Sequence, residues 1–239
     1  MTLPIVVHVE GFDDRHFLAG MVERLGWIPA REKHAQERVK TLLADSRTPN
    51  TSFGYLSPSR DRALLVNPGL AGHGNEAGVF ERVAFALSEP ERRRELIACV
   101  DSDLPSDDPD PTRPRLDRMR VVDPDRRVEL AVWHWRPGVD RQGVPKKQTL
   151  ERLVLGVLSE IEGSKGHGAI VDRFLAEAPA ASSLTGKHFA WATMAKWYGE
   201  HGCGDFYQAL WREDAFAQAM RATLDEHRIL PLFREALAR

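Results

Sequence analysis

The stretch IVVHVEGFDDRHFLAGMVERLGW, residues 5–27, decides the fold. Its apolar run stops abruptly at Glu10 and Gly11, and apolar residues then recur at helical spacing over residues 14–25. This pattern predicts a short buried strand that leads directly into an amphipathic helix. A short strand so rich in apolar residues is typical of a parallel sheet covered by helices on both faces.

The same alternation continues along the chain. Further apolar runs predict strands over residues 63–66, 96–100 and 129–135, and amphipathic patterns predict helices over residues 76–87 and 148–161. Strands that alternate with helices indicate an α/β fold with a mostly parallel, Rossmann-like sheet.

Two regions depart from this rhythm. Residues 104–127 carry five prolines and many charges, which predicts a long surface excursion after the third strand. From residue 163 onward we find no good strand, so we expect residues 1–162 to form one domain and residues 163–239 to form an α-helical C-terminal extension packed on it. The helices expected in the extension span residues 170–176, 187–199 and 215–224, with a short tail over 230–237.

Composition limits the functions to consider. A formal net charge of -2 predicts no strong overall attraction to nucleic acid or membranes, so a nucleic-acid site must be a local patch. The two cysteines, Cys99 and Cys203, match no zinc spacing and fit a reducing compartment. The N-terminus lacks a signal-peptide pattern, and no run reaches the roughly 18 apolar residues that span a bilayer. We therefore expect a cytoplasmic protein without a membrane partner.

Carboxylates gather where the predicted strands end. Glu10 follows the first strand and Asp14 lies one turn into the next helix, while Asp101 and Asp103 follow the third strand and Glu151 begins the helix after the fourth. Functional groups of open α/β sheets lie at this edge. Taken singly, each acid can equally be a helix cap or a solvated loop residue. Together they repel one another unless a cation neutralises them, and oxygen ligands favour Mg²⁺ or Mn²⁺.

These motifs resemble the Toprim domain, the metal-binding fold of topoisomerases, bacterial primases, maturation ribonucleases and OLD-family nucleases. The resemblance rests on V-E-G-F-D-D-R-H-F-L, on the glycine-bearing loop V-N-P-G-L-A-G-H-G-N and on A-C-V-D-S-D, and it covers residues 4–160. T-L-E-R-L and T-G-K-H-F-A are similar to stand-alone proteins of the OLD-like branch. The resemblance implies that residues 1–162 form a Toprim-like metal-binding domain.

The resemblance also implies roles for single residues. Glu10 is expected to be a metal ligand and a general acid or base, and Lys187 a catalytic lysine, although a solvated lysine at a helix start is the simpler alternative. Implied ligands of one or two Mg²⁺ or Mn²⁺ ions are Glu10, Asp14, Asp101, Asp103 and Glu151, and implied turn glycines are Gly11, Gly69 and Gly72.

Such a site serves phosphoryl transfer on a polynucleotide. A topoisomerase or primase needs segments that the sequence lacks, so a nuclease acting on DNA or RNA is the expected member of the class. Arginines near the D-S-D motif can bind phosphates, or they can be solvated surface residues: Arg92, Arg93, Arg113 and Arg115.

Partners follow from the same resemblance. No P-loop motif occurs in the sequence, and OLD-like nucleases are commonly coupled to an ATPase, which implies a separate ATPase subunit and a role in bacterial anti-phage defence. Whether the protein forms a homo-oligomer stays open. Two alternatives also stay open: a non-catalytic Toprim scaffold that serves assembly, and a phosphatase of the haloacid-dehalogenase type, which begins with a D-x-D after an apolar strand.

Overall fold

A six-stranded sheet forms the centre of the protein. The computed structural model describes residues 5–30, 53–68, 76–88, 95–105, 108–134, 148–162 and 203–238. The strands are β1 (Ile5–Val9), β2 (Ile28–Pro29), β3 (Phe53–Leu56), β4 (Ala63–Pro68), β5 (Glu95–Asp101) and β6 (Val128–Trp133), in the order β2-β3-β4-β1-β5-β6. Strands β4, β1, β5 and β6 are parallel, and β3 runs antiparallel to both of its neighbours.

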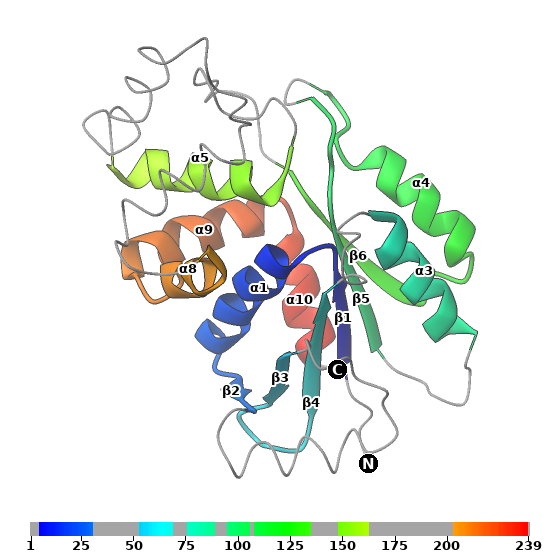
Figure 1. The fold of residues 1–239 in the computed structure, drawn as a ribbon, viewed down its shortest axis with the longest axis horizontal. Coiled ribbons are helices and arrows are strands. Elements are labelled where there is room, and N and C mark those ends of the chain that lie inside the picture. Colours follow the sequence, from blue (N-terminus) through cyan, green and yellow to red (C-terminus); the bar gives the residue numbers. More distant parts are fainter. Residues whose placement is uncertain are drawn as a thin grey trace.

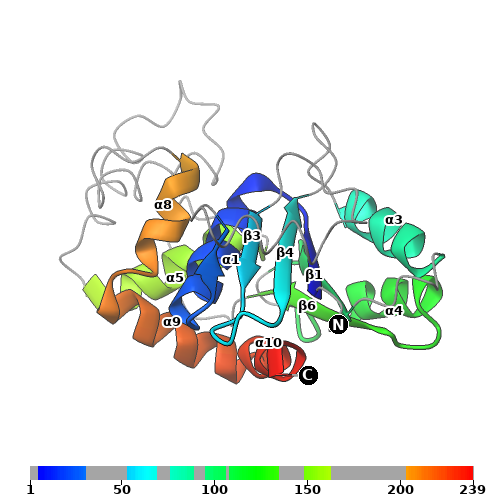
Figure 2. The ribbon, with the colours of Figure 1, turned by 90° about the horizontal axis from the view of Figure 1, so that it is seen from below.

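Helices cover both faces of this sheet. The described helices are α1 (Phe12–Arg24), α3 (Glu76–Leu87), α4 (Arg113–Val122), α5 (Leu150–Glu162), α8 (Cys203–Leu210), α9 (Asp214–Glu226) and α10 (Ile229–Ala238). Helices α3 and α4 lie on one side of the sheet, and α1, α5, α8 and α9 lie on the other (Figures 1 and 2). The predicted α/β fold, mostly parallel and with a helical C-terminal region, is confirmed.

Alternating side chains of the strands build two cores. On β1, Ile5 and Val7 join the core formed with α1, α5 and the C-terminal helices, whereas Val6 joins the core formed with α3 and α4. This two-sided burial explains why β1 is apolar at every position except His8, which is also buried.

The C-terminal helices pack against the rest of the protein through the shared core and through several specific contacts. Gly20 of α1 lies against Trp211, which follows α8. At the other end, the buried Arg62 donates a 2.6 Å hydrogen bond from Nη1 to the carbonyl oxygen of Leu237 in α10. Residues 203–210, for which no helix was predicted, form α8, and the helices predicted over 170–176 and 187–199 lie outside the described residues.

The structure corrects the prediction of a long surface excursion over residues 104–127. Its central part forms the ten-residue helix α4, whose Met119 is buried against the core of α3. The prolines were misleading because Pro114 lies in the first helical turn, where a missing N–H leaves no hydrogen bond unmade. Strands β2 and β3 were not predicted either, because β2 has only two residues and Gly54 weakens the β3 signal.

Candidate metal centre at the carboxyl edge of the sheet

The site lies where the chain leaves adjacent strands in opposite directions. After β1 the chain enters α1 on one face, and after the neighbouring β5 it enters α4 on the other. Such a divergence opens a crevice at the carboxyl ends of parallel strands. Glu10 follows β1 and Asp101 ends β5, and the Asp101 backbone N–H donates a 2.8 Å hydrogen bond to Glu10 Oε1. Residues 91 positions apart in sequence are thus in direct contact.

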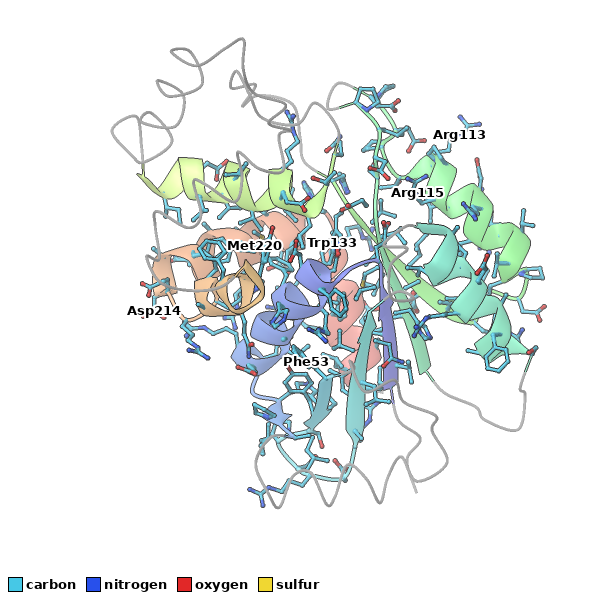
Figure 3. The ribbon with its side chains drawn as sticks, in the orientation of Figure 1. Phe53, Arg113, Arg115, Trp133, Asp214 and Met220 are labelled. Atoms are coloured by element: carbon cyan, nitrogen blue, oxygen red, sulfur yellow. The ribbon has the colours of Figure 1, made fainter. Side chains whose placement is uncertain are left out.

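Asp14 enters the site from the first turn of α1. Its Oδ2 accepts a 3.1 Å hydrogen bond from the Gly11 backbone N–H, so the carboxylate caps the start of the helix. Its Oδ1 accepts a second hydrogen bond of 3.1 Å from the indole Nε1–H of Trp133, at the end of β6. Figure 3 shows Trp133 beside the start of α1. Asp14 is therefore both a helix cap and a member of the site.

Helix α5 contributes from the opposite side. The backbone N–H of its first residue, Leu150, donates a 2.8 Å hydrogen bond to Asp101 Oδ1. The positive end of the helix dipole therefore faces the Asp101 carboxylate. The next residue, Glu151, is only 6% exposed. The first turn of α5 thus stabilises one carboxylate and adds another.

Acidic side chains near Asp14 and Asp101 raise the pKa of both carboxyl groups. Burial raises the pKa of Asp14 well above its usual value of 3.8, and the charges of Glu10, Glu151 and Asp13 raise it further. Burial likewise raises the pKa of Asp101, followed by the charges of Asp14, Glu10 and Glu151. We call Glu10, Asp14, Asp101 and Glu151 the carboxylate cluster. Its charge favours the uptake of protons or of a cation.

Asp103 lies outside the carboxylate cluster. Its side chain is 41% exposed and forms a 3.2 Å ion pair with Nη2 of Arg115, whose Nε also donates to the Asp101 carbonyl oxygen over 2.9 Å. The backbone turns here, because Asp103 adopts a φ of 57° and its N–H binds the Gln148 carbonyl oxygen. The two acids of the D-S-D motif are thus separated, with Asp101 inside and Asp103 at the rim.

The carboxylate cluster suits a hard divalent cation in charge and in donor type, since its side-chain ligands are all oxygens. In the described residues, however, no three carboxylate, imidazole or thiol side chains are already grouped so as to hold an ion. A cation bound by three members of the cluster therefore requires at least one of them to change its rotamer.

The remaining predicted residues have different outcomes. The chain bends at Gly11, between β1 and α1, but with an extended φ of -130° and ψ of -179° that does not require glycine. A Cβ at Gly11 would lie 3.2 Å from Asp14 Oδ2, and the glycine instead leaves room for that carboxylate. Arg113 points to solvent, with its side chain 73% exposed. Lying outside the described residues are Gly69, Gly72, Arg92, Arg93 and Lys187.

Comparisons with known proteins bear on the fold alone. No family model matches the chain, and no curated protein matches it. One solved structure shares the fold. It is a hypothetical protein from Pyrococcus horikoshii OT3, with a TM-score of 0.61 and 15% sequence identity over 99% of this chain and 100% of that chain. In the part of this chain that the structure describes, no helix is long and apolar enough to cross a membrane.

Proposed function

We propose that this protein is a metal-dependent nuclease that hydrolyses phosphodiester bonds in DNA or RNA. The observation that carries the proposal is the carboxylate cluster, in which four acids from the ends of β1 and β5 and from the first turns of α1 and α5 come together. Protons or a cation can relieve the repulsion within this cluster, and the resemblance to the Toprim domain supports a cation in this role. A separate ATPase partner stays a prediction from that resemblance.

The four members of the carboxylate cluster would hold one or two Mg²⁺ or Mn²⁺ ions. Such an ion offsets the charge of the phosphodiester and activates water for attack. Glu10 is the proposed general acid or base, with Oε1 oriented by the Asp101 N–H. Its burial, at 8% exposure, keeps bulk water from competing for a transferred proton.

Arg115 is the proposed contact for the substrate phosphate. Its guanidinium is anchored on the Asp101 carbonyl oxygen and lies at the rim of the cluster, where Asp103 is its present anionic partner. A guanidinium fork binds phosphate oxygens in the same way as it binds a carboxylate. The exposed Arg113 is proposed to contact a phosphate further along the polynucleotide, and Arg92, Arg93 and Lys187 stay proposals from sequence.

The decisive experiment is incubation of the purified protein with supercoiled plasmid and with a structured RNA, in Mg²⁺, Mn²⁺ or EDTA. We expect nicking or cleavage that EDTA abolishes. Cation binding without cleavage of either substrate would favour the non-catalytic scaffold. Absence of both cleavage and cation binding would overturn the metal centre itself.

The separation of the D-S-D motif gives a first prediction. Asp101→Asn is expected to lower cleavage at least about 100-fold, because it removes a charge from the cluster, whereas Asp103→Asn is expected to lower it less than about 10-fold. Initial nicking rates at saturating Mg²⁺ measure both effects. Equal losses in the two variants would mean that Asp103 leaves Arg115 and binds the cation during turnover.

The raised pKa values give a second prediction. Because the pKa of Asp101 is higher in the folded chain than its usual 3.8, the folded state is favoured when the group is protonated. That stability is fully present below about pH 3.8 and is lost as the pH rises through the folded value. In EDTA, Asp101→Asn should therefore raise the melting temperature, by roughly 2–4 °C per kcal/mol of repulsion relieved, and more at pH 8 than at pH 5.

Calorimetry with and without Mn²⁺ checks this prediction. The ion should raise the melting temperature of the wild type more than that of Asp101→Asn, since it binds the folded cluster. A matched control is Asp125→Asn, which changes an acid whose side chain is 73% exposed. A pH-independent difference between Asp101→Asn and the wild type would contradict the assigned repulsion.

A further inference from the structure

The carboxylate of Asp14 is fixed by donors on both oxygens. The Gly11 backbone N–H donates to Oδ2 and the Trp133 indole N–H donates to Oδ1, and both hydrogen bonds are 3.1 Å long. Two donors on opposite oxygens fix the plane of the carboxylate as well as its rotamer. Each oxygen still has a second lone pair available to a cation.

Trp133 differs in kind from the backbone donors described above. Gly11, Asp101 and Leu150 donate from the backbone, and substitution leaves those groups in place. Trp133 donates from its side chain, which is 0% exposed and rests edge-on against Phe17, with ring centroids 5.5 Å apart. The indole is therefore held rigidly, and its N–H can be removed without removing an aromatic ring.

We propose that Trp133 is a positioning residue of the metal centre, whose indole N–H fixes Asp14 in the orientation in which it binds the cation. The inference rests on the proposed function, since it assigns Asp14 as a ligand. Partners that orient a metal ligand typically change metal affinity by about 10- to 100-fold when they are removed. The large aromatic residue at the end of β6 thus serves the site as well as the core.

The chain offers a matched control in Trp211. Like Trp133, it is buried in the same core and packs on Phe17, with ring centroids 5.3 Å apart. Its indole Nε1, in contrast, has no acceptor within the described part of the chain. Trp133→Phe and Trp211→Phe therefore remove similar buried area, and only the first removes a hydrogen bond to the carboxylate cluster.

The test measures the dissociation constant of Mn²⁺ alone by electron paramagnetic resonance, on full-length wild type and both variants. We expect Trp133→Phe to weaken Mn²⁺ binding by about 10-fold or more and Trp211→Phe to change it less than about twofold. A loss of packing alone would weaken binding equally in both variants, and that result would overturn the inference.

A second measurement does not depend on the folding of Trp133→Phe. The sequence has six tryptophans, and Trp→Phe variants of the other five assign the Trp133 indole N–H resonance of the wild type by elimination. Saturating Mg²⁺ is expected to shift this resonance, and an unchanged resonance would overturn the inference. Normal Mn²⁺ binding in Trp133→Phe would overturn it while leaving the nuclease proposal intact. Absence of Mn²⁺ binding in the wild type would overturn both.

Discussion

Glu10→Gln is expected to lower metal-dependent cleavage at least about 100-fold while the fold stays intact. The amide keeps an oxygen that can accept the Asp101 N–H, so the local hydrogen bond survives. What is lost is a negative charge at the centre of the carboxylate cluster, and with it the proposed acid or base. Initial nicking rates over a range of Mg²⁺ concentrations measure the effect, with urea unfolding as the check on stability.

A matched control for this variant is Glu81→Gln, on the exposed side of α3. It changes the same residue type away from the crevice and should retain full activity. If Glu10→Gln cleaved at the same rate as the wild type, Glu10 would have no role in the mechanism. The activity would then arise from another part of the chain.

Gly20→Ala is expected to destabilise the protein by roughly 2–3 kcal/mol, a drop in melting temperature of roughly 5–10 °C. In an ordinary helix this change stabilises by about 1 kcal/mol, because alanine is the better helix former. Here a Cβ would lie 2.4 Å from Trp211 Cδ1 and 2.9 Å from the Gln208 carbonyl oxygen. The backbone oxygen cannot move aside as a side chain can, so α1 and α8 would have to separate.

Thermal and urea unfolding measure this effect, and Ala84→Gly is the reverse change at an exposed position of α3. That control should cost about 1 kcal/mol by helix propensity alone. An increase in stability on Gly20→Ala would mean that the contact between α1 and α8 is looser than the structure shows.

The part of the fold that could be predicted rests on local pattern. The apolar run of β1 requires burial on both faces, and parallel strands end at one edge, so the approach of Glu10 and Asp101 follows from the sequence alone. The helical spacing of α1 and α5 similarly places Asp14 and Glu151 in first turns.

The part that could not be predicted depends on single backbone torsions and on distant contacts. Asp103 follows Asp101 by two residues, yet its own left-handed backbone conformation accompanies a turn that leaves its side chain at the rim, paired with Arg115. The hydrogen bond from Trp133 to Asp14 joins residues 119 positions apart, and nothing in the pattern of a buried aromatic residue reveals where its N–H points. Helix α4 was missed because the prolines around it suggested a loop, whereas its one proline, Pro114, lies in the first turn, where a helix tolerates it.

Helix α1 has a mechanical consequence. It carries Asp14 in its first turn and Gly20 six residues later, at the contact with Trp211, so about 9 Å of rigid helix joins a proposed metal ligand to the C-terminal helices. Because Gly20 has no Cβ, α1 and α8 lie in close contact, and a displacement of α8 is expected to move α1 with it. A partner that shifts α8 is therefore expected to move Asp14 relative to Glu10 and Asp101, so that binding at the C-terminal helices would change the geometry of the carboxylate cluster.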